Sequence, residues 1–153
     1  MSAPTSSHAY GIGVIALIVG MSAVMVFYTS FYIPESLAKP SVSEHILNPD
    51  GDFIIEIVPG AVIDGNENYV PNQAKVLLGV SNNVIWKNLD DTPHTVTPDH
   101  RASDSYSGDF GSIGVIKSGE SFEFLFTEAQ EIPYHCKPHP WMTGKISIEL
   151  SRF

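Results

Sequence analysis

Two patterns of apolar and polar residues divide the chain. From Ala9 to Ile33 the sequence is apolar almost throughout, and no Asp, Glu, Lys or Arg occurs before Glu35. About 20 such residues are enough for a helix to span the hydrocarbon core of a bilayer. We therefore predict a transmembrane helix over residues 10–33, which Pro34 should end because proline cannot continue the helical hydrogen-bond ladder.

Two other interpretations compete with a membrane anchor. A cleaved signal peptide would use the small residues of the segment Ser36-Leu37-Ala38, but no Lys or Arg precedes the apolar run, which is also longer than the usual 7–15 residues or so. A buried core helix is disfavoured because the run is apolar on all sides. The pair Ala16 and Gly20 could seat a second helix, although this signal is weak.

From Asp52 onward, short runs with a period of two replace the helical pattern. Turn residues such as Pro59-Gly60 and Lys117-Ser118-Gly119-Glu120 separate these runs. This spacing predicts an all-β fold in which two sheets pack face to face as a Greek-key sandwich. The expected strands are 53–58, 74–78, 83–87, 94–97, 115–116, 121–127, 132–136 and 145–150.

We therefore expect three segments: an N-terminal anchor (1–34), a tether rich in proline and serine (35–51), and one domain (52–153). Phe122, Phe124 and Phe126 should share one buried face of a strand. In the last strand, Ile146, Ile148 and Leu150 should do the same.

Charge and cysteine content exclude some classes of function. The chain has 17 acidic and 8 basic residues, a formal net charge of −9, and these residues all follow the apolar run. Such a surface does not by itself attract nucleic acid. The single cysteine, Cys136, excludes a disulfide bond within the chain.

A short segment near the C-terminus combines three metal-binding side chains. Cys136, His139 and Met142 follow the spacing C-x2-H-x2-M, so one tight loop can direct a thiolate, an imidazole and a thioether at the same ion. This mixture of soft and borderline ligands favours copper. Structural zinc sites generally use more thiolates or another spacing.

A copper site with two histidines and one cysteine needs a second histidine from elsewhere. His8 precedes the apolar run, His45 lies in the tether, and His135 should face away from its neighbour Cys136. His94 opens the β-rich run HTVT after a proline, where a strand end can hold it rigidly. We favour His94 over His100, which lies in a long polar loop.

Sequence motifs across residues 52–150 resemble the cupredoxin family, and the plastocyanin and amicyanin branch most closely. The motifs are V-x-W-x-N-x5-H-x-V, then SFEFLF, and then YHCKPHPWMTGKI, with the short ligand loop of the amicyanin type. In the first motif the matching residues are Val84, Trp86, Asn88, His94 and Val96.

The resemblance implies one type 1 copper ion bound by His94, Cys136, His139 and Met142, and no catalytic residues. It also implies that Asn88 ties the two ligand-bearing segments together by hydrogen bonds. The N-terminal helix resembles that of membrane-anchored archaeal relatives.

The function implied is that of a membrane-anchored blue copper protein that shuttles single electrons between redox partners. We expect a single-pass protein of the cell membrane with its copper domain outside the cytoplasm. Partners should dock on an apolar patch near His139 and Trp141, formed with Pro93, Pro138 and Pro140. Two alternatives stay open: an open-site copper enzyme acting on a small molecule such as a nitrogen oxide, and a copper-binding subunit or copper-delivery protein of a membrane complex.

Overall fold

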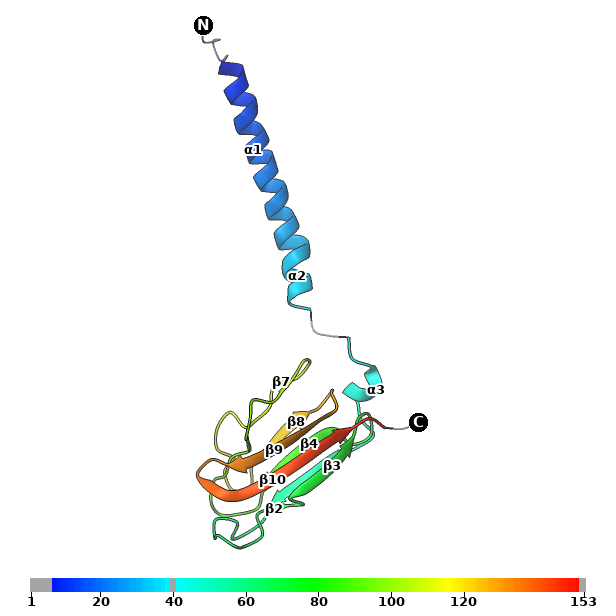
Figure 1. Ribbon diagram of the computed structural model, residues 1–153, viewed down its shortest axis with the longest axis vertical. Coiled ribbons are helices and arrows are strands. Elements are labelled where there is room, and N and C mark those ends of the chain that lie inside the picture. The colour runs from blue at the N-terminus through cyan, green and yellow to red at the C-terminus, as the bar shows by residue number, and fades with distance from the viewer. Residues whose placement is uncertain (1–6, 39–40, 152–153) are drawn as a thin grey trace. The chain divides into compact units, whose positions relative to one another are not determined.

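The computed structural model describes residues 7–38 and 41–151, and the chain divides into two units, residues 1–39 and 40–153. Figure 1 shows a helix in the first unit and a strand-rich domain in the second. Each unit is considered by itself.

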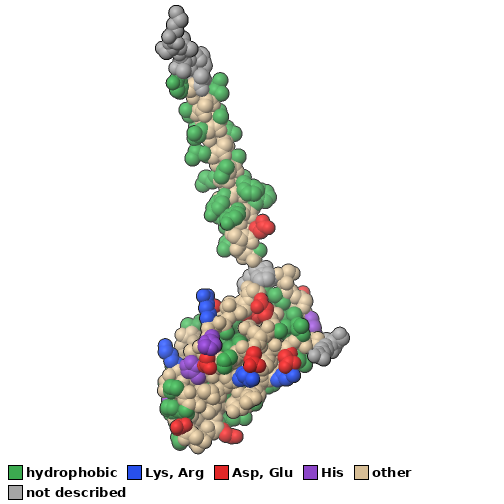
Figure 2. Space-filling view, viewed as in Figure 1, with side chains coloured by type: hydrophobic (Ala, Val, Ile, Leu, Met, Phe, Trp, Pro, Cys, Tyr) green, Lys and Arg blue, Asp and Glu red, His purple; other side chains and the backbone are tan. Residues whose placement is uncertain are grey.

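The first unit contains one continuous apolar helix. It consists of α1 (Ser7–Phe27), a π-helical turn η1 (Tyr28–Tyr32) and α2 (Ile33–Ser36). Residues Tyr10–Ser36 are long and apolar enough to cross a membrane. Apolar side chains cover the face of the helix seen in Figure 2, without Lys or Arg. The chain therefore has a candidate N-terminal transmembrane helix.

The expectation that Pro34 ends the helix is wrong, because the helix continues to Ser36. Pro34 lies in the first turn of α2, where its missing N–H costs little. The N–H of Ile33 donates to the carbonyl of Tyr28, a π-type bond five residues back. This wider turn lets the backbone pass the proline without breaking.

The second unit is a sandwich of two four-stranded sheets, which confirms the predicted fold class. Their strand orders are β2-β1-β4-β8 and β3-β10-β9-β5, and a small hairpin β6-β7 lies outside them. Most neighbours are antiparallel, but β1 with β4 and β3 with β10 run parallel. The strands are β1 (Asp52–Ile57), β2 (Tyr69–Val70), β3 (Gln73–Leu77), β4 (Asn83–Asn88), β5 (Thr97–Pro98), β6 (Ser103–Asp104), β7 (Gly108–Asp109), β8 (Ser121–Leu125), β9 (Gln130–Cys136) and β10 (His139–Glu149).

Aromatic rings fill the space between the two sheets. The Trp86 side chain of β4 is fully buried, and its ring lies within 6 Å of the rings of Phe110, Phe122 and Tyr134, at centroid distances of 5.5, 5.4 and 5.8 Å. Phe124 and Phe126 are also buried, as their period of two predicts. Phe110 was not expected in the core, because it belongs to a loop that is otherwise polar.

Three predicted strands differ most from the observed ones. The predicted strand 115–116 is reduced to one bridge residue, Ile116. In the predicted strand 94–97, only Thr97 belongs to β5, and His94 instead forms an isolated bridge with Ile116. Leu150 is 69% exposed, so its predicted burial is wrong. The alternation stops there because β10 ends at Glu149 and no strand holds the backbone of Leu150 in register.

The segment predicted as a tether contains one helical turn, α3 (Glu44–Leu47). Ile46 packs against the core, and the side-chain amide of Asn82 donates to the carbonyls of Ile46 (2.9 Å) and Phe126 (2.6 Å). In Figure 1, α3 lies at the end of the sandwich opposite to the turn between β9 and β10. The chain therefore joins the sandwich at that end.

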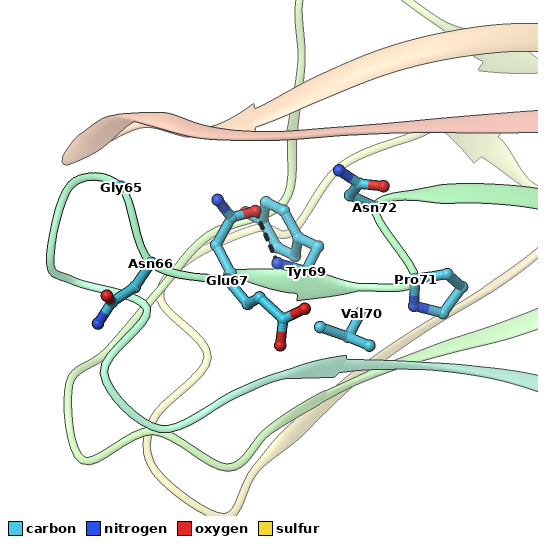
Figure 3. A pocket seen from close by; sticks show the side chains of 8 residues that line it. Gly65, Asn66, Glu67, Tyr69, Val70, Pro71 and Asn72 are labelled. Carbon is cyan, nitrogen blue, oxygen red and sulfur yellow. Dashed lines mark hydrogen bonds between the residues drawn. The ribbon is translucent and has the colours of Figure 1, made fainter.

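The edge strand β2 and the loop before it line a shallow polar pocket. Figure 3 shows residues 65–72 around it, including Glu67 and Asn72. Tyr69 is 1% exposed, so its ring faces the core, and its hydroxyl donates to the carbonyl of Thr95 at 2.6 Å. This strand thus supports the segment that follows His94.

A buried carboxylate organises the hairpin β6-β7. Asp104 is 2% exposed and accepts hydrogen bonds from the N–H groups of Tyr106 (3.0 Å), Ser107 (2.9 Å) and Thr127 (2.5 Å), and from the Thr127 hydroxyl (2.7 Å). Burial alone would raise the pKa of Asp104, but these donors outweigh it and hold the pKa below its usual 3.8.

We expect Asp104→Ala to lower the free energy of unfolding by about 3 kcal/mol at pH 7, because it leaves buried donors without an acceptor. Since the pKa of Asp104 is lower in the folded protein, the unfolded chain binds a proton first as the pH falls. The contribution should be complete above pH 4 or so and should shrink as the pH falls through 3.8. Denaturant unfolding of both proteins from pH 7 to pH 3 measures this difference.

Asp109→Ala is the matched control, because Asp109 lies in the same hairpin and is exposed. Among the residues that the structure describes, its side chain hydrogen-bonds only to Arg101, at 3.4 Å. It should change the free energy of unfolding by less than about 0.5 kcal/mol. Equal effects of the two substitutions would contradict the role given to Asp104.

Candidate metal centre

Two of the predicted ligands lie on either side of the turn between β9 and β10. Cys136 ends β9 and is fully buried, while His139 begins β10 and is half-buried. The pairing of the two strands shifts register between His139 and Thr143, so the ligand loop departs from regular sheet geometry. His135 faces away from Cys136, as expected, and its Nδ1 lies 2.6 Å from Asp99 Oδ1.

The third predicted ligand, His94, comes from the opposite side of the site. Its backbone pairs with Ile116 in both directions, N to O at 3.1 and 2.7 Å. The side-chain amide of Asn88 donates to the carbonyls of Thr92 (2.8 Å) and Ile116 (2.9 Å). His94 is fully buried, and these hydrogen bonds hold the segment that bears it.

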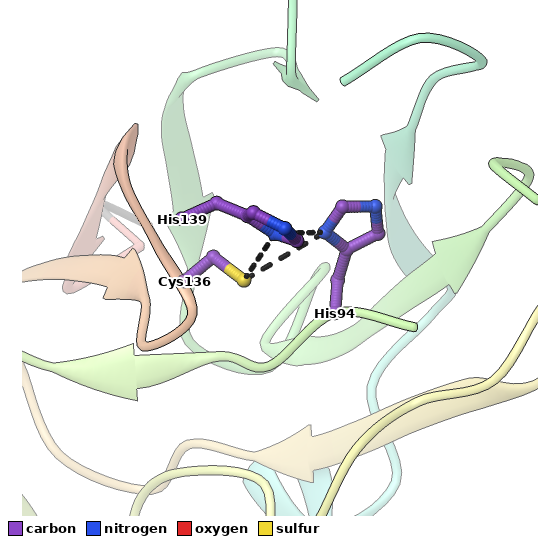
Figure 4. A group of neighbouring side chains, drawn as sticks. All are labelled: His94, Cys136 and His139. Carbon is purple, nitrogen blue, oxygen red and sulfur yellow. Dashed lines mark hydrogen bonds between the residues drawn. The ribbon is translucent and has the colours of Figure 1, made fainter. Parts of the chain in front are cut away.

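The three side chains point toward one another in Figure 4. The Cys136 Sγ atom lies 3.7 Å from His94 Nδ1 and 3.6 Å from His139 Nδ1, and the two Nδ1 atoms are 3.3 Å apart. These atoms form the one cluster of at least three His, Cys, Asp or Glu ligand atoms found among the described residues.

This triangle has the size that a transition-metal ion needs. A point equidistant from its three corners lies about 2 Å from each, close to the metal–nitrogen and metal–sulfur bond lengths of about 2.0–2.3 Å known for zinc. One thiolate and two imidazoles in a trigonal arrangement are the donor set of blue-copper sites. The residues present therefore fit a copper ion.

Electrostatics in the site favour the thiolate that copper requires. Burial alone would raise the pKa of Cys136, but hydrogen bonds from His94 and from the Thr95 N–H outweigh it and lower the pKa. Burial likewise opposes a charge on His94, yet its contacts with Cys136 and Asp90 raise the His94 pKa. The pKa of His139 is lowered by burial and by the charge of His94. A metal ion that binds to Cys136, His94 and His139 would displace the proton that these side chains hold between them.

Met142 lies in β10, three residues after His139, and its side chain is fully buried in the core. Its role as a fourth ligand remains a prediction.

Thr95 joins the two ligand-bearing segments, and sequence reasoning missed it. Its N–H donates to Cys136 Sγ at 3.4 Å, and its hydroxyl accepts from the N–H of Lys137 at 2.9 Å. The side-chain hydrogen bonds of Asn88, by contrast, stay on the His94 side of the site in the described structure. Thr95 therefore makes the connection between the two ligand-bearing segments that was expected from Asn88. The one sequence feature that could have indicated this role is that Thr95 directly follows the predicted ligand His94.

The remaining histidines belong to other elements of the chain. His8 is part of α1, His45 is in α3 beside Gly79, and His100 lines a surface pocket with Arg101. None of them belongs to the metal-binding cluster of the described residues.

Four exposed apolar residues lie beside His94 or His139 in the sequence or in contact with the His139 ring, and we call them the apolar rim. The ring centroids of His139 and Trp141 are 5.4 Å apart, and Trp141 is 40% exposed. Pro93, Pro138 and Pro140 are exposed as well. The imidazole of one predicted ligand thus reaches the surface among apolar side chains.

Comparisons with known proteins agree with this geometry. A sequence model of copper binding proteins of the plastocyanin/azurin family matches residues 61–149, more than half of the chain. Amicyanin from Paracoccus denitrificans is 30% identical over 95 residues, which cover 61% of this chain and 70% of that protein. Amicyanin from Paracoccus versutus is 26% identical over 96 residues, covering 61% and 69%.

A solved structure has the same fold. The novel purple cupredoxin from Nitrosopumilus maritimus superimposes with a TM-score of 0.51 at 27% identity, over 63% of this chain and 99% of the cupredoxin. The family match, the sandwich and the buried Cys-His-His triangle lead to one conclusion: this chain belongs to the plastocyanin/azurin family of copper-binding proteins, the cupredoxins, and takes a single copper ion as its cofactor.

Proposed function

We propose that this protein is a single-electron carrier anchored at the outer face of a membrane, with copper bound by His94, Cys136, His139 and Met142. The observation that carries the proposal is the buried triangle of three donor atoms, which side-chain and backbone hydrogen bonds hold in place. Copper supplies the exchange of one electron between its two oxidation states.

A carrier needs ligands that move little when the charge of the metal changes, and the protein holds its ligands from several sides. Ile116 and Asn88 fix the segment that bears His94. Thr95 connects this segment to the loop after Cys136. Such supporting contacts preorganise a metal site, and they favour electron exchange over binding and release of a substrate.

Electrons should enter and leave through His139. Its ring lies beside Trp141, and the other members of the apolar rim, Pro93, Pro138 and Pro140, are exposed, so a docked partner would exclude water from these side chains. Interfaces of redox partners are small and transient, below about 1,200 Å² in total. We therefore propose that redox proteins dock on this rim.

The N-terminal helix would confine the carrier to the membrane, as in the membrane-anchored archaeal relatives that it resembles. The helix has 27 residues, from Tyr10 to Ser36, and Glu35 near its end is the one acidic or basic residue among them. Figure 2 displays charges of both signs on the visible face of the sandwich domain. A copper–thiolate domain of this kind is expected outside the cytoplasm, with the N-terminus inside.

Cu(II) added to the full chain in detergent should give an intense visible thiolate-to-copper band and a narrow parallel hyperfine splitting in the paramagnetic-resonance spectrum. Cys136→Ser should abolish the band, and His94→Ala and His139→Ala should strongly alter it. Met142→Ala should change it modestly, because an axial thioether binds weakly. Optical and paramagnetic-resonance spectra of the five proteins test the ligand set.

A spectrum insensitive to Met142→Ala but altered by azide would contradict the closed carrier site. It would favour the open-site enzyme acting on a small molecule. Copper that a chelator removes within seconds would favour copper delivery instead.

Thr95→Val should weaken copper binding about fivefold, which corresponds to about 1 kcal/mol, because it removes the hydroxyl that accepts from Lys137. Thr95→Ser keeps that hydroxyl and is the matched control, with an expected change below about twofold. Competition with a copper chelator measures both affinities. Equal affinities of the two variants would rule out a supporting role of the hydroxyl.

Membrane orientation can be tested by labelling single cysteines in a Cys136→Ser background. In intact expressing cells, an impermeant maleimide should label Ser118→Cys, which is exposed on the domain. It should label Ser6→Cys only after the membrane is permeabilised. The reverse pattern, or labelling of both sites in intact cells, would contradict the proposed orientation.

A further inference from the structure

A buried carboxylate contacts the side of the His94 ring that faces away from the thiolate. Asp90 Oδ2 lies 2.8 Å from His94 Nε2, and Asp90 is only 4% exposed. The other ring nitrogen, Nδ1, faces Cys136 and His139. The imidazole therefore has the metal position on one side and a carboxylate on the other.

The protein fixes Asp90 in this position. Its Oδ1 accepts a hydrogen bond from the N–H of Gly60 at 2.9 Å, and its own N–H donates to Asn88 Oδ1 at 2.9 Å. Gly60 has a φ of 82°, a conformation that favours glycine and that directs its N–H here. The loop after β1 and the turn after β4 thus both hold the carboxylate against the ring.

Both carboxylate oxygens of Asp90 are placed as hydrogen-bond acceptors. Oδ1 accepts from the N–H of Gly60, and Oδ2 faces His94 Nε2. With Asp90 as the acceptor, Nε2 of His94 carries the proton. Nδ1 can then offer its lone pair to a metal ion.

The two histidines of the site are therefore not equivalent. His94 is fully buried and bound to a carboxylate, whereas His139 is half-buried. Among the hydrogen bonds and ion pairs of residues 7–38 and 41–151, none joins His139 to a carboxylate. One ligand is buried beside a negative charge, and the other meets solvent and the apolar rim.

We infer that Asp90 is a positioning residue that orients His94 and biases the site toward divalent ions, and thereby lowers the reduction potential of the copper. The predicted effect of Asp90 on the reduction potential rests on the proposed electron-transfer function. The predicted effect of Asp90 on metal binding does not. A fixed negative charge stabilises Cu(II) more than Cu(I), because Cu(II) carries one more positive charge. A hydrogen bond to a carboxylate also makes the imidazole a stronger base and a better ligand.

Asp90→Asn tests this role, because asparagine has nearly the same shape and keeps an oxygen acceptor but lacks the charge. Asp91→Asn is the matched control: it removes the same charge one residue later, from an exposed side chain. The reduction potentials of the full-length copper protein and the two variants are compared at pH 7 in one detergent.

Asp90→Asn should lower the ratio of Cu(II) to Cu(I) affinity at least tenfold, which for one electron raises the potential by about 59 mV. Asp91→Asn should change this ratio less than about threefold, because water screens an exposed charge. Equal shifts in the two variants, or a lower potential in Asp90→Asn, would overturn the inference.

Zinc provides a readout that does not depend on electron transfer. Asp90→Asn should weaken Zn²⁺ binding about 10- to 100-fold, as removal of a ligand's supporting partner typically does, and Asp91→Asn should leave it unchanged. Nitrogen-15 chemical shifts of the zinc form should place the His94 proton on Nε2 in the unsubstituted protein. Unchanged zinc affinity in Asp90→Asn, or a proton on Nδ1, would overturn the positioning role even if the copper site carries electrons.

A failure of the proposed electron-carrier function would give a different result from a failure of the inference about Asp90. If the unsubstituted protein lacked a thiolate-to-copper band, the electron-carrier proposal would fall, while the zinc measurements would still decide the role of Asp90.

Discussion

The placement of His94 is the constraint on which the metal site depends. Cys136 and His139 are only three residues apart, so one short loop brings them together, but neither can complete a trigonal donor set without a nitrogen from 42 residues earlier in the chain. The sandwich supplies that nitrogen by setting the end of β4 beside Ile116 and pairing the His94 backbone with it. The site is thus a property of the fold as much as of the ligand loop.

Much of this arrangement could be predicted because its determinants are local. The spacing of Cys136, His139 and Met142 is visible in seven consecutive residues, and the period of two in Phe122, Phe124 and Phe126 fixes which face is buried. The choice of His94 depended on a motif whose spacing is also short. Membership of the cupredoxin family and the sandwich architecture follow from these signals together.

The residues that sequence reasoning missed act over long separations. Asp90 is held by Gly60, 30 residues away, and Thr95 contacts the sulfur of Cys136, 41 residues away. Phe110 enters the core from a polar loop because the aromatic cluster has room for one more ring. The local sequence pattern also gave wrong predictions for the helix end at Pro34 and for the burial of Leu150. At both residues, backbone hydrogen bonding determines where the helix or strand ends.

The attachment of α3 keeps it apart from the metal site. Ile46 and Asn82 fix the incoming chain at one end of the sandwich, while the ligands gather at the other end, beyond Asn88. The six residues of β4 between these ends span about 20 Å. The sandwich therefore keeps the predicted metal ligands the length of a rigid strand away from the end at which α3 packs. A change in the chain before α3 would leave that separation as it is.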